Sequence, residues 1–304
     1  MDAPRARLTT EPLPTPIAWP YRIEAWGAAF IFALLGCMPL DAASAVGGML
    51  ARRIGPRLGV SNRARRNLRT ALPELSATQI AAILRGMWDN LGRVAAEYPH
   101  LRNIRVFDAM SRVETRGLEN LDDALAAGRR VILFGGHLGN WEIAALAAGQ
   151  YGIDVAQIYR AANNPLVDRM IARLRGGTGE LIPKGAVASR RAVAALRRGG
   201  HVSLLADQKL NDGIAVPFFG RDAMTAPAIA RLALQFACPI VPVRVERLVG
   251  ARFRFTVEPP LAIADTGDTA ADVRAAMTRV NAVIEAWARA RPEQWLWLHR
   301  RWPD

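Results

Sequence analysis

Cysteine and histidine are scarce in this chain of 304 residues, which contains two cysteines and four histidines. Cys37 and Cys238 lie in apolar stretches, so neither a disulfide framework nor a cysteine-ligated metal cluster can form, and a reducing compartment fits best. The histidines show no HExxH or paired spacing that would indicate a metal site. A Gly-x-Ser-x-Gly nucleophile elbow is absent too. We therefore expect a function without metal, cofactor or covalent enzyme intermediate.

Acidic residues are also in the minority, since 27 Asp and Glu stand against 40 Lys and Arg, for a formal net charge of +13. Such a chain favours anionic partners: nucleic acid, an anionic membrane, or an acidic substrate or protein. Its densest basic stretch carries Arg63, Arg65, Arg66 and Arg69. No nucleic-acid recognition motif or aromatic platform accompanies it, so we exclude nucleic acid and favour anionic lipid headgroups. A solvated helix face is the alternative.

The N-terminal region lacks the basic start and apolar core of a secretory signal peptide, because residues 1–21 contain five prolines and the acidic Asp2. Export is therefore not expected. Two charge-free stretches follow, 25–40 and 42–51, and the pair Pro39 and Asp41 interrupts them. Each is shorter than the roughly 20 apolar residues that a membrane-spanning helix needs.

Aromatic residues gather where the first of these stretches begins, at Trp19, Tyr21 and Trp26. Tryptophan and tyrosine are typical of membrane interfaces. We predict that residues 1–60 contain a membrane-associated helical element, interrupted in the middle, that dips into one leaflet. The alternative is a pair of buried core helices.

From residue 61 onward the sequence predicts one domain, 61–304, without an internal repeat or a separating linker. Ser76 and Gln79 have the spacing of a capping box that opens a long amphipathic helix ending near Pro99. Strand and helix patterns then alternate, which predicts an α/β fold with a mixed, mostly parallel central sheet flanked by helices. The expected strands are 131–134, 155–159, 181–183, 202–206, 215–219, 240–245 and 253–258, and the expected helices are 118–127, 165–174, 187–198, 226–236 and 270–290.

The segment 131–142 carries the strongest chemical signal. A buried strand ends at Gly135 and Gly136, so His137 lies at the carboxyl end of a strand, where open α/β sheets bind ligands. We expect Asn140 to cap the following helix and Glu142, in its first turn, to reach a ring nitrogen of His137. A histidine oriented by a carboxylate is a general base for a substrate hydroxyl. A structural turn histidine is the alternative.

The sequence His137-Leu-Gly-Asn-Trp-Glu142 resembles the HX4(D/E) motif of glycerolipid and lysophospholipid acyltransferases. It is most similar to the HxGNWE version in the lipid A biosynthesis acyltransferases, the lauroyl and myristoyl transferases. Four further sequence blocks resemble blocks of this family and occur in the same order, and the N-terminal apolar element fits the family as well. They are Arg66-Asn-Leu68, the YR-x3-NP-x2-D block at 159–168, Asp207-Gln208 with the PFFG sequence at 217–220, and the P-x2-W-x-W-x-HRR block at 292–301.

The resemblance implies a glycerolipid acyltransferase-like fold and acyl transfer from acyl carrier protein to a hydroxyl of a phosphorylated glycolipid, a lipid A precursor. The reaction would take place at the cytoplasmic face of the anionic inner membrane, with His137 as base and Glu142 as its partner. Arg160 would stabilise the thioester oxyanion or hold a phosphate, unless it forms an ion pair with Asp168. Asp207 and Gln208, which directly follow a predicted strand, would line the same edge of the sheet as His137 or belong to a buried polar network that supports the loop.

Two other functions are compatible with the sequence. The acceptor can be a lysophospholipid or another membrane glycolipid, with the same chemical centre. A non-catalytic membrane module that binds acyl carrier protein or lipid through its basic face is the second alternative. For Trp295 and Trp297 we expect a packing role, and we expect His299, which lies among cations, to be a poor base.

Overall fold

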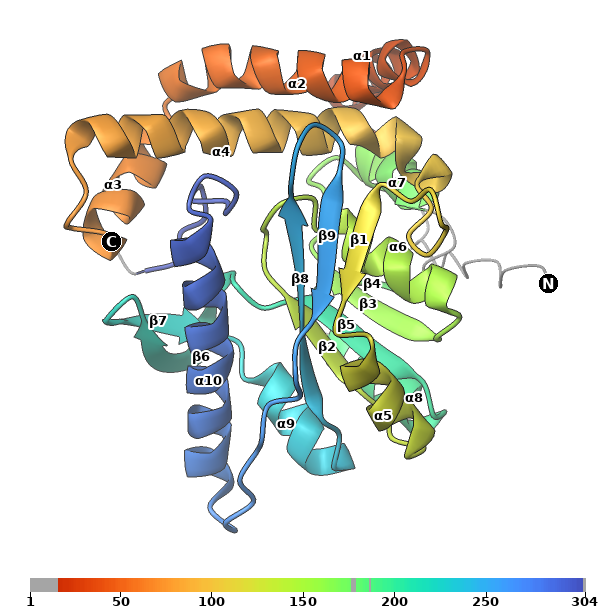
Figure 1. Cartoon of the computed structure of the whole chain (residues 1–304), viewed down its shortest axis with the longest axis vertical. Helices are drawn as coiled ribbons and strands as arrows, with labels where there is room; N and C mark the ends of the chain where they lie inside the picture. The colour runs from red at the N-terminus through yellow and green to blue at the C-terminus, as the bar shows by residue number, and fades with distance from the viewer. Residues whose placement is uncertain (1–15, 176–178, 186, 303–304) are drawn as a thin grey trace.

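The computed structural model describes residues 16–175, 179–185 and 187–302. Its centre is a seven-stranded sheet with the order β1-β9-β8-β2-β5-β3-β4, and a hairpin of β6 and β7 lies beside it (Figure 1). The strands are β1 (Val113–Arg116), β2 (Ile132–Gly135), β3 (Val155–Tyr159), β4 (Leu181–Pro183), β5 (His201–Leu205), β6 (Lys209–Phe218), β7 (Arg221–Thr225), β8 (Ile240–Arg247) and β9 (Phe253–Val257).

Strand directions make the sheet mixed and mostly parallel, as the sequence predicts. β2 pairs in parallel with β5 and with β8, and β3 and β4 continue the parallel part. β9 is antiparallel to β8, and β1 pairs in parallel with β9. The strands β1 and β7 were not predicted, because both are short and neither contains a continuous apolar run.

Helices cover both faces of the sheet. One core cluster joins α5 (Glu119–Ala126) and α6 (Glu142–Tyr151) to the strands, and the other joins α8 (Ala188–Arg197), α9 (Ala228–Phe236) and α10 (Thr269–Ala290). The remaining helices are α1 (Trp19–Gly36), α2 (Leu40–Ile54), α3 (Ser61–Ala71), α4 (Ala77–Glu97) and α7 (Pro165–Arg175), with short 3-10 turns at Gly55–Arg57 and Tyr98–Asn103.

The helices α2 and α4 lie across the carboxyl ends of the parallel strands (Figure 1). They pack closely because Gly47 faces Gly92, where a Cβ atom on either residue would collide with the other helix. The predicted capping box is present, with Ser76 and Gln79 bonded reciprocally at the start of α4. This helical layer therefore stands over the edge of the sheet where His137 lies.

The N-terminal apolar region forms two helices that meet at Pro39, where the sequence predicts an interruption. No residue of α1 is buried, so the alternative of two core helices does not hold for α1. Among the described residues, no helix combines the length and the apolar character that a membrane crossing requires. The absence of a signal peptide was argued on residues 1–21, of which 1–15 lie outside the described residues.

Candidate active site

The loop after β2 holds His137 in a fixed backbone position. Its carbonyl oxygen accepts a hydrogen bond from the Leu296 amide at 3.0 Å, and Leu138 forms a bridge with Trp295. Gly139 has a φ of 55°, and a Cβ atom there would collide with the carbonyl group of Val245. A side chain at position 139 is therefore excluded by conformation and by space.

Asp207 is the carboxylate that holds His137. The Nδ1 atom of His137 lies 2.7 Å from Oδ1 of Asp207, and the His137 backbone amide donates to Oδ2 at 2.7 Å. Trp295 donates a third hydrogen bond to Oδ2 at 2.9 Å. Burial of Asp207 would raise its pKa, but the charge and hydrogen bonds of His137 outweigh burial and hold this pKa well below its ordinary value.

An ionised carboxylate can only accept a hydrogen bond, so Nδ1 of His137 is the protonated nitrogen. The Nε2 atom is then the basic nitrogen, and it faces Nε2 of Gln208 at 3.4 Å. Histidine oriented in this way can accept a proton from a hydroxyl group placed at Nε2.

The expected contact between Glu142 and His137 is wrong. The Glu142 carboxylate forms a bidentate ion pair with Arg175 of α7, with both distances 2.6 Å. Tyr98 and Trp141 donate to Oε1 of Glu142 at 2.7 and 3.0 Å. The Arg175 charge and these hydrogen bonds overcome the effect of burial and lower the pKa of Glu142. Glu142 therefore stays charged but is already fully engaged.

Asn140 is buried and bonds to more than the helix start. Its Oδ1 accepts from the Glu142 amide at 3.2 Å, and its Nδ2 donates to Glu97 at 2.7 Å. The N-cap residue of α6 is Trp141, one position later than predicted. Glu97 is fully buried and pairs with Arg247 at 2.5 and 2.9 Å. No sequence pattern predicted this buried pair, which joins α4 to β8.

A pocket opens beside Nε2 of His137, and we call it the His137 pocket. Its charged lining side chains include Glu142, Arg160, Arg175 and Lys184, and Gln208 lines it too. Arg160 follows β3 at the sheet edge, as predicted. Among the described residues Arg160 forms no ion pair with Asp168, whose carboxylate instead accepts from the Tyr159 hydroxyl at 2.9 Å and from the Ala162 backbone amide at 2.8 Å.

The C-terminal block forms the wall behind His137. Trp295 and Trp297 are buried, as predicted, and Trp302 is buried as well. The His299 ring lies 4.7 Å from the His137 ring, centroid to centroid. Burial and the nearby His137 charge lower the pKa of His299 to about 3, so His299 remains neutral. It is therefore a poor base, in line with the sequence analysis, although its proximity to His137 was not foreseen.

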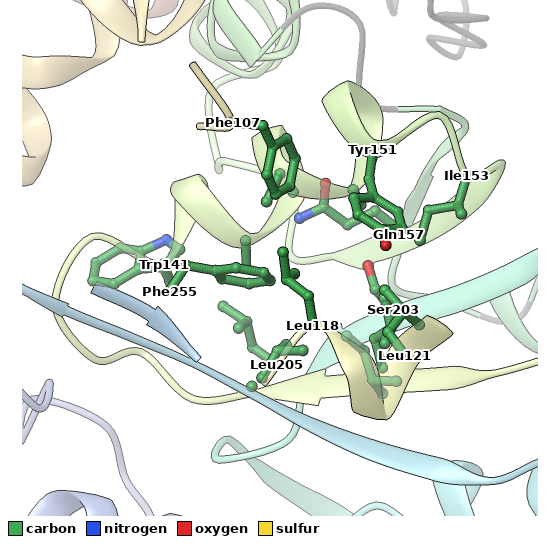
Figure 2. Close-up of a pocket in the computed structure, with 18 residues that line it drawn as sticks. Phe107, Leu118, Leu121, Trp141, Tyr151, Ile153, Gln157, Ser203, Leu205 and Phe255 are labelled. Carbon is green, nitrogen blue, oxygen red and sulfur yellow. The ribbon is translucent and has the colours of Figure 1, made fainter. Parts of the chain in front are cut away.

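An apolar cavity adjoins the His137 pocket, between the sheet and helices α5 and α6 (Figure 2). Trp141, Gln157 and Leu205 line both the pocket and the cavity. The other walls are almost entirely apolar and include Phe107, Leu118, Leu121, Ile153 and Phe255. The site thus places the Nε2 atom of His137 next to a hydrocarbon-lined space, which suits a substrate with a reactive polar end and an apolar chain.

The comparison with known families agrees with this arrangement. A model described as bacterial lipid A biosynthesis acyltransferase matches residues 16–304. The chain belongs to this family. Members of the lipid A biosynthesis acyltransferase family transfer acyl chains, and the His137 pocket with its adjoining apolar cavity fits that reaction class.

Curated relatives of this acyltransferase are distant but cover most of its length. A lipid A biosynthesis acyltransferase of Haemophilus influenzae is 23% identical over 292 residues, 92% of this chain and 89% of the relative. A lipid A biosynthesis myristoyltransferase of Escherichia coli K12 is 26% identical over 279 residues, 90% of this chain and 85% of the relative. A phosphatidylinositol mannoside acyltransferase of Mycobacterium tuberculosis is 30% identical over 195 residues, 61% of this chain and 58% of the relative.

Proposed function

We propose that the protein transfers a fatty acyl chain from acyl carrier protein to a hydroxyl of a lipid A precursor, with His137 as general base. The observation that carries this proposal is the hydrogen bond of 2.7 Å between Nδ1 of His137 and the buried Asp207. That bond directs the basic Nε2 atom into a pocket that adjoins an apolar cavity. The proposal replaces the expected His137 and Glu142 pair with His137 and Asp207.

The reaction proceeds by direct attack. Nε2 of His137 removes the proton of the acceptor hydroxyl while its oxygen attacks the thioester carbonyl carbon. The tetrahedral intermediate collapses by breaking its carbon–sulfur bond, and the imidazolium of His137 returns the proton to the leaving thiolate. Asp207 stabilises the transient imidazolium, and the protonation state of His137 is restored at the end of each turnover.

The other polar residues of the His137 pocket support this reaction. Arg160 supplies positive charge for the developing oxyanion or for a phosphate, and Gln208 contacts the reacting groups near Nε2 of His137. Glu142 and Arg175 hold one wall of the pocket in place through their ion pair. Asn140 anchors the loop after β2 to α4 through its hydrogen bond to Glu97.

The apolar cavity is the proposed site of the acyl chain. Its lining residues on α6 are small, namely Ala144, Ala145, Ala147 and Ala148, so a chain can lie between this helix and the sheet. The length of the cavity, measured from the His137 pocket, then sets the preferred length of the acyl chain.

The exposed apolar face of α1 is the proposed membrane contact. Trp26 and Phe30 are 62% and 71% exposed, and Trp19, Ile23 and Leu34 are exposed as well. Phe32 of α1 stacks on Tyr98, which bonds to Glu142 in the His137 pocket. Binding of α1 to the cytoplasmic face of the inner membrane would therefore place the pocket beside its lipid substrate.

Another acceptor is the second candidate, supported by the mycobacterial relative, which is named for a phosphatidylinositol mannoside. Purified protein should be incubated with acyl-loaded carrier protein and, in parallel, with a lipid A precursor, a lysophospholipid or a phosphatidylinositol mannoside. An acyl mass increment on the lipid A precursor is expected. An increment only on another lipid would establish the second candidate, and no increment on any lipid would support a non-catalytic binding module.

A further inference from the structure

Two cations in the His137 pocket, Arg160 and Lys184, have no carboxylate partner in the part of the chain that the structure describes. The Glu142 carboxylate forms an ion pair with Arg175 at one wall of the pocket, and the Asp207 carboxylate is hydrogen-bonded to His137. Within the described ranges 16–175, 179–185 and 187–302, neither Arg160 nor Lys184 has a carboxylate oxygen within ion-pair distance. The pocket therefore carries positive charge that its own side chains leave uncompensated.

The backbone brings these two cations to one place. Arg160 directly follows β3 and Lys184 directly follows β4, and the last residues of these parallel strands, Tyr159 and Pro183, are paired in register. The Lys184 amide donates to the Tyr159 carbonyl at 2.7 Å, which fixes the start of the loop after β4. Arg160 and Lys184 therefore lie beside each other at the carboxyl edge of the sheet.

Lys184 is also linked to the base through one side chain. Its Nζ atom donates to Oε1 of Gln208 at 3.3 Å, and Nε2 of Gln208 faces Nε2 of His137 at 3.4 Å. The ammonium group is thus separated from the proposed base by a single carboxamide. A group held at Lys184 lies close enough to the reacting centre to orient a substrate there.

Electrostatics favours an anion between the two cations. Burial and the repulsion of Arg160 lower the pKa of Lys184, although Asp207 acts in the opposite direction. A bound anion would stabilise the charged form of Lys184 and screen it from Arg160. A guanidinium can bind two oxygens of a phosphate at once, and an ammonium can neutralise a third as a point charge.

We propose that Arg160 and Lys184 form a phosphate subsite of the substrate, beside the base. The proposal rests on the proposed acyl transfer and commits Arg160 to phosphate rather than to the oxyanion. The ligand chemistry is a phosphate ester, which two substrates can supply. One source is a phosphate of the acceptor glycolipid, and the other is the phosphodiester in the phosphopantetheine arm of the donor.

The test uses Arg160→Gln and Lys184→Gln, with Arg190→Gln as the matched control. Arg190 is exposed on α8, does not line the His137 pocket and loses the same charge. Initial rates are measured with phosphorylated and dephosphorylated acceptor, and with acyl-phosphopantetheine and acyl-pantetheine as truncated donors. The two subsite variants should raise KM for the phosphorylated form of one substrate about ten- to a hundredfold, with little change in kcat.

The substrate arms identify the source of the phosphate. If the acceptor supplies it, the increase in KM disappears with the dephosphorylated acceptor. If the donor supplies it, the increase disappears with acyl-pantetheine. A penalty that is equal with and without phosphate in both substrates, or no penalty with any of them, overturns the subsite.

A binding measurement separates this inference from the proposed function. Calorimetric titration with inorganic pyrophosphate needs no turnover, and wild type and Arg190→Gln should bind it at least tenfold more tightly than Lys184→Gln. Equal binding by all variants contradicts the subsite even when acyl transfer is intact. Absence of acyl transfer by the wild-type protein would contradict the proposed function, while the loss of pyrophosphate binding in Lys184→Gln would still support an anion site.

Discussion

Oδ2 of Asp207 accepts two hydrogen bonds, from the His137 amide at 2.7 Å and from the Trp295 indole at 2.9 Å, while Oδ1 faces the His137 ring. The carboxylate is therefore held in one orientation by three groups and cannot rotate away from the His137 ring. Three segments distant in the chain meet at this residue, and each contributes to the orientation of His137.

The His137→Ala variant should lose acyl transfer by about a thousandfold or more, because no other described side chain of the pocket offers a free basic nitrogen next to Asp207. Initial rates with acyl carrier protein as donor measure the effect. His201→Ala is the control, since His201 lies at the start of β5, does not line the His137 pocket, and its ring accepts a hydrogen bond from the Val131 amide. Equal rates for His137→Ala and wild type would remove His137 as the base.

The two carboxylates near the loop should respond differently to neutralisation. Asp207→Asn should lower kcat by about a thousandfold or more, because the amide no longer holds the required tautomer of His137. Glu142→Gln should act mainly on stability, since it leaves the buried Arg175 without its partner, at a cost of about 3–5 kcal/mol. Parallel kcat measurements and urea denaturation separate the two effects. A large loss of kcat in a stably folded Glu142→Gln would return Glu142 to the catalytic role.

Acid should destabilise the protein through Asp207. The pKa of this buried carboxylate is lower in the folded state than in the unfolded chain, so its contribution is complete above the unfolded pKa of about 4 and falls as the pH drops below it. The expected loss for one such group is on the order of 2 kcal/mol. Urea denaturation between neutral pH and about pH 3 should show a shallower decline for Asp207→Asn than for wild type. Equal declines in the stability of Asp207→Asn and of wild type would show that Asp207 does not cause the acid sensitivity.

Filling the apolar cavity should shift the acyl preference. Ala147→Leu places a branched side chain from α6 in the cavity and should favour shorter acyl donors. A competition among donors of increasing chain length, read by mass spectrometry of the product, measures the shift. Ala192→Leu is the matched control, because Ala192 is equally buried on α8 at the other face of the sheet. Overpacking costs each variant about 1–3 kcal/mol, so both need a stability measurement. An unchanged donor preference in folded Ala147→Leu would place the acyl chain elsewhere.

Charges on the exposed face of α1 should weaken lipid binding. Phe30→Glu removes apolar area from the proposed contact and adds repulsion from anionic lipid, so vesicle sedimentation should show at least a tenfold loss. Val249→Glu is the control, since Val249 is 80% exposed on a different segment. Wild-type binding should also weaken with salt. Equal binding by both variants would remove α1 from the membrane contact.

The sequence predicted the sheet class because the apolar strands and amphipathic helices alternate clearly from residue 118 onward. His137 was located at a strand end for the same reason. The neighbours of β2 could not be predicted, and they decide which carboxylate reaches His137. Only the pairing of β2 with β5 brings Asp207 to the ring.

The remaining differences between the predicted and the observed site come from contacts between residues that are far apart in the sequence. The sequence analysis paired Glu142 with His137 because Arg175, the residue that in fact binds the Glu142 carboxylate, lies 33 residues away. Hydrophobic periodicity predicts the helix that carries Arg175 but not where this helix packs. Lys184 follows a strand of three residues and stood outside the recognised motif blocks. The cavity could not be predicted either, because its volume depends on how α6 sits above the sheet rather than on any single residue.

The assembly of the centre from β2, β5 and the C-terminal block has a consequence for folding kinetics. His137 and Asp207 are 70 residues apart, and Asp207 and Trp295 a further 88, so no local fragment contains the base, its carboxylate and the wall behind them. Loops of this length close slowly, and the central parallel pairings form only after most of the chain is present. Refolding should therefore recover activity in its slowest phase, together with the burial of Trp295, rather than with the early formation of helices.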